Sequence, residues 1–282
     1  MPSRGYTMSL SFPPFTHWVK RLILANAAIF FAVTVLNAFS PDTANQVIVI
    51  GGLKPVLVAH GFLWQLVTYS FLHAGLWHLF SNMLGLWMFG SQLESDWGGR
   101  QFLEFYFFCV VAAALVTVAV GYSGFLGADP RVRTVGASGG VFGILVAFAV
   151  LYGDRELMLF PFPFTIKAKY VVWGWIFITL ISVFTPGPSG IAYFAHLGGA
   201  LFGYLYLKFL PRRGLSYATS EKYFGIRNSY YRWKRRRAAR KFEVYMRNHD
   251  RADYFDEHGN YRGPETKVPD KKNGESKSPW VN

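Results

Sequence analysis

The sequence predicts an all-α membrane protein, and its composition, its apolar segments and its charge distribution support that class. Hydrophobic residues make up 52% of the 282 residues and charged residues only 16%, whereas soluble domains contain about 25% charged residues. The mean hydropathy is +0.20 although residues 211–282 are strongly polar, so the apolar residues are concentrated before them. This composition excludes an ordinary soluble enzyme, a disordered chain and a collagen-like chain.

Six segments are apolar enough to be spanning helices, which need about 20 residues each. They are residues 21–39, 72–91, 101–121, 136–153, 170–186 and 191–210. The first could be a signal peptide, but no small-residue cleavage site and soluble domain follow it, so we expect an uncleaved span. The predicted organisation is a cytoplasmic N-terminus at 1–20, a six-helix bundle at 21–210 and a basic, partly disordered cytoplasmic tail at 211–282.

Basic residues predict the orientation, because they gather in cytoplasmic loops. Of the 29 Lys and Arg residues, 19 lie between Lys208 and the C-terminus. With six spans, only Lys54, Arg131 and Arg133 fall on the opposite side. We therefore expect both termini in the cytoplasm, and the second, fourth and sixth spans to begin at the outer face. The six spans with a cytoplasmic tail favour a bacterial plasma membrane.

Acidic residues are missing from the middle of the spans, which argues against a proton relay or a cation-coupled transporter. Before the tail they lie in loops or near span ends: Asp42, Glu94, Asp96, Glu104, Asp129, Asp154 and Glu156. Cys109 is the single cysteine, which excludes an intramolecular disulfide and a cysteine metal cluster.

Polar side chains instead lie in the outer halves of the three spans that begin outside. The second span carries His73, His78 and Asn82, the fourth opens with Ser138, and the sixth carries His196. Any one of them has an ordinary explanation, because membrane serines often bond a backbone carbonyl and a lone histidine is often a packing residue. Their common depth on three helices favours one functional site.

These segments resemble the rhomboid family of intramembrane serine proteases. Residues 136–139 read GASG and match the G-x-S-G motif, and residues 195–199 read AHLGG, followed by Gly203, and match the sixth-span histidine motif. His73, His78 and Asn82 match the H-x4-H-x3-N pattern of the second span. The resemblance covers about residues 20–210. It departs from the family at Gln65, where an arginine often follows the loop tryptophan (here Trp64), and at Phe142, where many members have a tyrosine.

The chemistry expected from these residues is acyl transfer by a dyad. A serine hydroxyl needs a base to become a nucleophile, and His196 is the candidate base for Ser138, with no acid nearby to complete a triad. His78 and Asn82 are four residues apart on one helix face, so with the backbone N–H of Ser138 they are candidate oxyanion donors. The resemblance implies the same roles.

Supporting roles are expected for neighbouring residues. Phe142, one turn after Ser138, can pack on the imidazole ring of His196. Glycines at 136, 139, 143, 199 and 203 include two small-x-x-x-small faces, which allow close helix approach but equally serve ordinary membrane packing. His73, at the start of the second span, is expected to cap that helix or to bond the first loop.

Roles are also expected for three further segments. The loop 40–71 is expected to lie partly in the outer interface, and the turn 185–190 is either a lid or a plain connection. The basic stretch 230–241 is expected to bind anionic lipid headgroups rather than nucleic acid. From Gly263 onward the composition predicts disorder.

The sequence therefore predicts a serine endopeptidase that cleaves membrane proteins near the outer face and needs neither metal nor cofactor. The resemblance implies substrates with a single, helix-destabilised span and a small residue before the scissile bond. One alternative is a catalytically inactive scaffold that binds transmembrane client proteins. A transporter or channel is the other alternative, and it would require charged or broken midplane segments.

Overall fold

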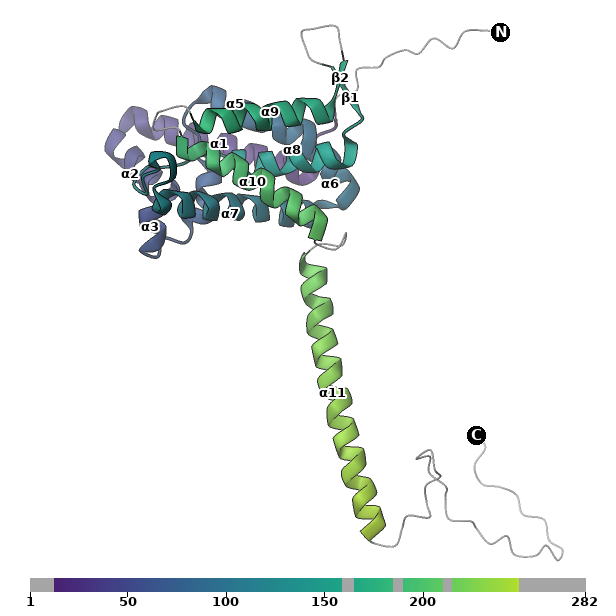
Figure 1. The fold of residues 1–282 in the computed structure, drawn as a ribbon. Helices are drawn as coiled ribbons and strands as arrows, with labels where there is room; N and C mark the ends of the chain where they lie inside the picture. Colours follow the sequence, from purple (N-terminus) through teal and green to yellow (C-terminus); the bar gives the residue numbers. More distant parts are fainter. Residues whose placement is uncertain (1–12, 159–164, 185–189, 210–214, 249–282) are drawn as a thin grey trace, which may run out of the picture. The chain divides into compact units, whose positions relative to one another are not determined.

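The computed structural model describes residues 13–158, 165–184, 190–209 and 215–248 (Figure 1). The chain divides into two compact units, Met1–Ala218 and Thr219–Asn282, and each is described by itself. Residues 185–189 of the hypothetical lid and the segment after Gly263 lie outside the described residues.

The first unit is mainly helical, as the sequence predicts. Its longer helices are α1 (His17–Phe39), α2 (Pro41–Gly51), α5 (Leu76–Gly85), α6 (Ser91–Trp97), α7 (Gly99–Ser123), α8 (Ser138–Tyr152), α9 (Ala168–Val183) and α10 (Gly190–Phe209). Shorter turns are α3 (Pro55–Ala59), α4 (Gln65–Thr68), η1 (Tyr69–Phe71), η2 (Leu86–Gly90) and η3 (Phe125–Gly127). Strands β1 (Glu156–Met158) and β2 (Thr165–Lys167) form an antiparallel pair in which Glu156 lies opposite Lys167.

Two of the described helices, α1 and α7, are long and apolar enough to cross a membrane, and α8 and α9 are shorter apolar helices. Five predicted spans agree with single helices to within a few residues. The predicted segment 72–91 corresponds to the continuous helical run 76–97, which begins four residues later than predicted and in which a π-helical turn, η2, joins α5 to α6. Such turns insert an extra residue into a helix and are frequent beside functional sites.

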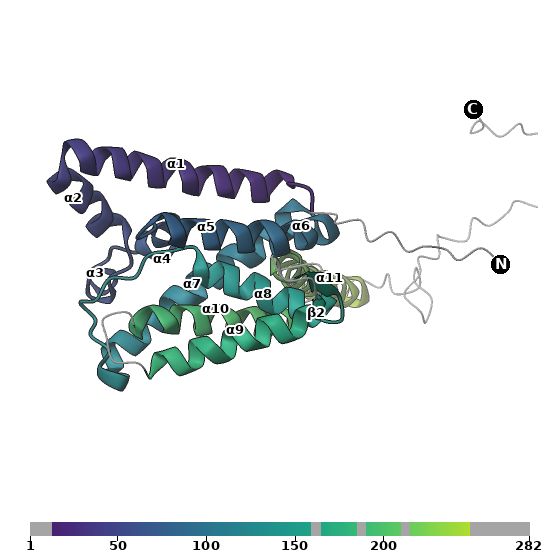
Figure 2. The same cartoon turned by 90° about the horizontal axis from the view of Figure 1, so that it is seen from above.

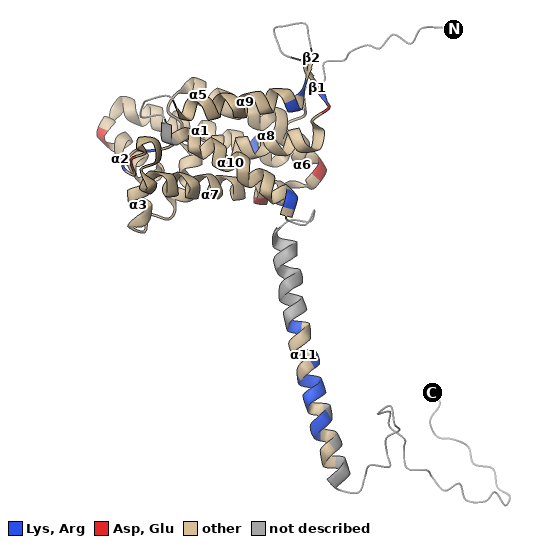
Figure 3. Cartoon of the chain, viewed as in Figure 1, with Lys and Arg blue, Asp and Glu red and all other residues tan. Residues whose placement is uncertain are grey.

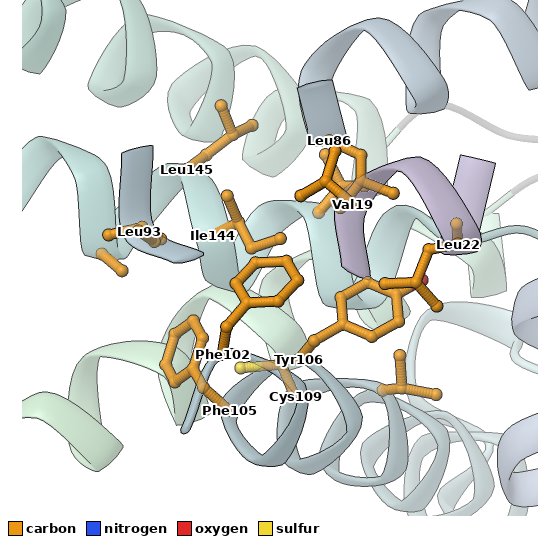
Figure 4. Packing of buried hydrophobic residues seen from close by; sticks show 14 of the residues in the cluster. Val19, Leu22, Leu86, Leu93, Phe102, Phe105, Tyr106, Cys109, Ile144 and Leu145 are labelled. Atoms are coloured by element: carbon orange, nitrogen blue, oxygen red, sulfur yellow. The ribbon is translucent and has the colours of Figure 1, made fainter. Parts of the chain in front are cut away.

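Helix α10 packs against α7, α8 and α9, and α9 lies along the edge of the unit opposite α1 (Figure 2). The side chains of Phe102, Phe105, Tyr106 and Cys109 of α7 are fully buried and face Ile144 of α8 (Figure 4). The outward faces of the helices remain apolar, as in α9, where Phe177 is 62% exposed. An apolar exterior of this extent is typical of a protein whose solvent is lipid.

Helix α1 is attached to this bundle chiefly at its first turn. The buried carboxylate of Glu94 in α6 accepts hydrogen bonds from the backbone N–H groups of Trp18 and Val19, each at 2.9 Å, and from the hydroxyl of Thr16. A negative charge is favourable there, because the first N–H groups of a helix have no partners within it. Glu94 thus supplies the cap that the side chain of Thr16 does not provide.

Gln65 organises the loop between α1 and α5. Its side chain is fully buried, its amide nitrogen donates to the carbonyls of Val49 and Ile50 at 3.1 and 3.0 Å, and its amide oxygen accepts from the N–H of Lys54 at 3.0 Å. It therefore satisfies carbonyls that the end of α2 leaves open. At the position where the family often has an arginine, the glutamine thus makes three hydrogen bonds within the loop.

The second unit contains most of α11 (Leu215–Asn248), a helix of 34 residues that the sequence reasoning did not predict. The charged side chains of the first unit lie in loops and near helix ends, whereas α11 carries a dense run of basic residues (Figure 3). The described side chains of α11 between Arg227 and Tyr245 are exposed.

Candidate catalytic site

Glycines bring the backbones of α8 and α10 into direct contact. A Cβ atom at Gly199 would lie 1.9 Å from the carbonyl oxygen of Gly139, and one at Gly203 would lie 2.8 Å from the Cα of Gly143. No side chain fits at either place, so the expected close approach of these two faces is confirmed.

This contact sets the relative height of the candidate nucleophile and base. A Cβ at Gly139 would lie 3.7 Å from the carbonyl oxygen of Ala195, so Gly139 lies between Ala195 and Gly199 along α10. Ser138, the first residue of α8, is therefore at the level of His196. Both side chains are only partly buried, so another molecule can reach them.

The imidazole of His196 lies flat against Phe142. The two ring centroids are 4.5 Å apart with an interplanar angle of 8°, which confirms the expected packing. Phe142 also stacks on Trp175 of α9 with centroids 6.5 Å apart, and Tyr193 meets the imidazole edge to face at 6.1 Å. Ring contacts therefore orient His196, in a place where no described carboxylate bonds to it.

Gly136 allows His78 to approach Ser138. Its φ of +128° is strained for any other residue, and a Cβ there would lie 2.8 Å from Nε2 of His78 and 3.6 Å from Oγ of Ser138. The edge of the His78 ring and the hydroxyl of Ser138 therefore lie on either side of one small space. This is a physical reason for glycine at the first position of the GASG stretch.

Asn82 is buried, and its amide nitrogen donates to the backbone carbonyl of His78 at 2.8 Å. One amide donor is thus used within α5, and the nitrogen retains a second hydrogen. The expectation that His78 and Asn82 share a helix face agrees with their positions on α5. Their side chains do not bond to each other in this arrangement.

His73 lies in the extended segment before α5, whose N-cap residue is Gly75. The prediction that His73 caps this helix is therefore wrong, and no described side chain caps it. Its ring meets that of His78 edge to face with centroids 5.1 Å apart. Both ring nitrogens are buried and have no hydrogen bond of normal geometry within the described residues, although the backbone of Phe71 interacts with the ring.

An apolar groove of about 260 Å³ lies between α5, η2 and α9. Trp77 and Phe80 of α5 line one side and Trp175 lines the other. Because Trp175 also stacks on Phe142, the groove is separated from His196 by two aromatic rings. The contact of Trp175 with Phe142 could not be predicted from the sequence, since nothing in the spacing of the α9 aromatics distinguishes Trp175 from Trp173.

Within the described ranges, no group of three or more His, Cys, Asp or Glu side chains is arranged to hold a metal ion. The chemistry available at this place is that of a hydroxyl, two imidazoles, an amide and backbone N–H groups.

Comparison with known proteins places this arrangement in context. The Rhomboid domain profile matches residues 60–213. Rhomboid protein 1, mitochondrial, of Saccharomyces cerevisiae is 30% identical over 149 residues, which cover 50% of this chain and 40% of that protein. Rhomboid protease GluP of Bacillus subtilis is 29% identical over 197 residues (68% and 34%), and Rhomboid protease AarA of Providencia stuartii is 28% identical over 194 residues (65% and 69%). The chain thus spans less than half of the first two relatives.

We expect Gly199→Ala to separate α8 from α10 and to lower the melting temperature of the purified protein, because its Cβ meets the carbonyl of Gly139 at 1.9 Å. Overpacking of this kind costs about 1–3 kcal/mol. Gly174→Ala in α9 is the matched control, since a Cβ there has no neighbour within 4 Å. Equal melting temperatures for the two variants would contradict the tight contact.

Proposed function

Because the chain belongs to the rhomboid family and is therefore an integral membrane protein, we propose that it is an intramembrane serine endopeptidase. The proposal rests on one observation: Ser138 and His196 lie at the same height along their helices, because the glycines of α8 and α10 are in direct contact. Two of its relatives carry the name rhomboid protease, which supports the same activity here.

In the proposed mechanism His196 takes the proton of the Ser138 hydroxyl as the oxygen attacks a peptide carbonyl. His196 then gives the proton to the leaving amine, and water hydrolyses the acyl-enzyme with the same base. Stacking between Phe142 and His196 at 4.5 Å holds the ring in place of the acid that completes a triad. Because the ring is already oriented, little reorganisation accompanies proton transfer.

The carbonyl oxygen becomes negative during the attack, and three donors are proposed for it. They are the N–H of Ser138 at the first position of α8, the ring of His78 beside Gly136, and the second amide hydrogen of Asn82. A helix N-terminus favours negative charge. Donors held in advance of the reaction contribute more than donors that must first be oriented.

The proposed substrates are transmembrane proteins. The groove between α5 and α9 is apolar, and the stacked rings of Trp175 and Phe142 lie between it and His196. A lipid-exposed segment of another chain can occupy such a groove without the cost of burying unpaired polar groups. The preference for a helix-destabilised span and a small residue before the scissile bond belongs to the same proposal.

Membrane placement is proposed from the charge distribution. We propose six spans formed by α1, the α5–α6 segment, α7, α8, α9 and α10, with both termini in the cytoplasm. The proposed compartment is a bacterial plasma membrane, although several relatives are named as mitochondrial. This part of the proposal rests on the sequence.

The alternative is an inactive scaffold that uses the same groove to bind client proteins. The presence of both Ser138 and His196 favours the protease, because a scaffold does not need a hydroxyl and a base at one level. Cleavage of a model transmembrane substrate by the purified protein distinguishes the two functions.

Helix α11 supports a second partner, the anionic lipid surface. Lys234, Arg235, Arg236, Arg237, Arg240 and Lys241 lie within eight positions and are exposed. Tyr231, Phe242 and Tyr245 are exposed too and recur at helical spacing on one face. Basic residues near a lipid surface contribute about 1 kcal/mol each, and aromatic rings are favourable at the interface.

We expect Ser138→Ala and His196→Ala each to abolish cleavage of a transmembrane substrate while the protein remains folded in the membrane. Each change removes the activated nucleophile, so the double variant should be no worse than either single one. Turnover is measured on reconstituted protein with melting temperature as the control. Near-normal turnover of Ser138→Ala would show that the protease assignment is wrong.

Asn82→Ala should lower kcat about ten- to a thousandfold with little change in KM, because an oxyanion donor acts mainly in the transition state. Its observed bond to the carbonyl of His78 offers a purely structural explanation that would instead lower the melting temperature. Measuring both quantities on the same samples separates them. Wild-type kcat with a lowered melting temperature would remove Asn82 from the mechanism.

For α11, we expect trypsin to cleave the basic stretch more slowly in nanodiscs of phosphatidylglycerol than in nanodiscs of phosphatidylcholine. High salt should abolish the difference, because charge attraction to a membrane is screened. In a control variant the six basic residues at 234–241 are changed to Gln, which removes the trypsin sites there. Its cleavage is therefore measured with chymotrypsin, and the rate should be the same in both lipids. Equal cleavage rates in both lipids would contradict the proposal.

A further inference from the structure

A second pocket, of about 390 Å³, lies between the C-terminal half of α1, the end of α2 and the segment before α5. It is separate from the groove of α5 and α9, and its lining includes residues of the α7–α8 connection. Its volume is within the range of small-molecule sites, about 300–1,000 Å³.

Its polar lining consists of Thr34, Asn37, His73 and one cation, Arg133. Arg133 is exposed, and no described residue forms an ion pair with it; the ion pairs found within the described segments involve Asp154. The ring nitrogens of His73 are buried, and their one backbone interaction, with Phe71, does not reach normal hydrogen-bond geometry. None of the described residues that line the pocket is acidic. A buried polar group without a partner is costly, and an anion supplies a partner to both side chains.

Its apolar lining comes partly from α1. Phe30 and Val33 of α1 and Leu72 line the same pocket. Helix α1 is long and apolar enough to cross a membrane, and most of its residues are exposed. A small soluble anion would leave these apolar residues in contact with water, whereas hydrocarbon chains beside the anion would cover them.

We infer that this pocket binds the phosphate headgroup of an anionic phospholipid, held by Arg133 and His73, with its acyl chains along α1. Occupation also orients the His73 ring, which meets the ring of His78 at 5.1 Å. An effect on catalysis through His78 rests on the proposed function, whereas the binding itself does not.

The test is native mass spectrometry of the delipidated full chain with added phosphatidylglycerol. We expect Arg133→Gln to weaken binding about tenfold, the effect of one charge-assisted hydrogen bond. Arg131→Gln is the matched control, since Arg131 is exposed two residues away and does not line the pocket. Val33→Trp, which fills the pocket without changing charge, should weaken binding as well, with melting temperature measured to show that both variants are folded.

Two further ligands identify the source of the phosphate. Diacylglycerol lacks the phosphate and glycerol 3-phosphate lacks the chains, so neither should displace phosphatidylglycerol at equal concentration. Displacement by either compound, or wild-type binding by Arg133→Gln, would overturn the inference. Ser138→Ala should bind the lipid as the wild type does even if the protein is no protease, so the two proposals can fail separately.

Discussion

The absence of side chains where α8 meets α10 is the constraint on which the candidate site depends. The Cβ positions of Gly199 and Gly203 point at the backbone of α8, while those of Gly139 and Gly143 point at Ala113 and Cys109 of α7. Three helices are thereby stacked at minimal separation. The heights of Ser138 and His196, and the ring stack beyond them, follow from that separation.

Much of this arrangement could be predicted from the sequence because it depends on local patterns. Five of the six apolar segments are single helices close to their predicted bounds, and the i, i+4 relation of Ser138 and Phe142 anticipated the ring that contacts His196. The glycine spacing indicated the close helix pair. Each inference needed only the helical period and the chemistry of one residue type.

The rest depends on contacts between distant segments. No local pattern indicates that Glu94 caps a helix that begins 77 residues earlier at His17, or that Gln65 bonds the carbonyls at the end of α2. Hydropathy also does not predict the π-helical turn η2 or the stacking of Trp175 on Phe142. Helix α11 was missed because a high density of like charge was interpreted as a tail, although Lys and Arg are good helix formers.

The attachment of α1 by Glu94 has a consequence for motion. The buried residues of α1 are Val19, Leu22 and Asn26, all in its first half, so the helix is packed mainly near that end, while its other end continues through Ser40 into α2. A helix of 23 residues is about 34 Å long, and a tilt of about 5° about the held end displaces the other end by roughly 3 Å. That displacement would widen or narrow the space beside Phe30 and Val33, so the size of this pocket depends on the tilt of α1.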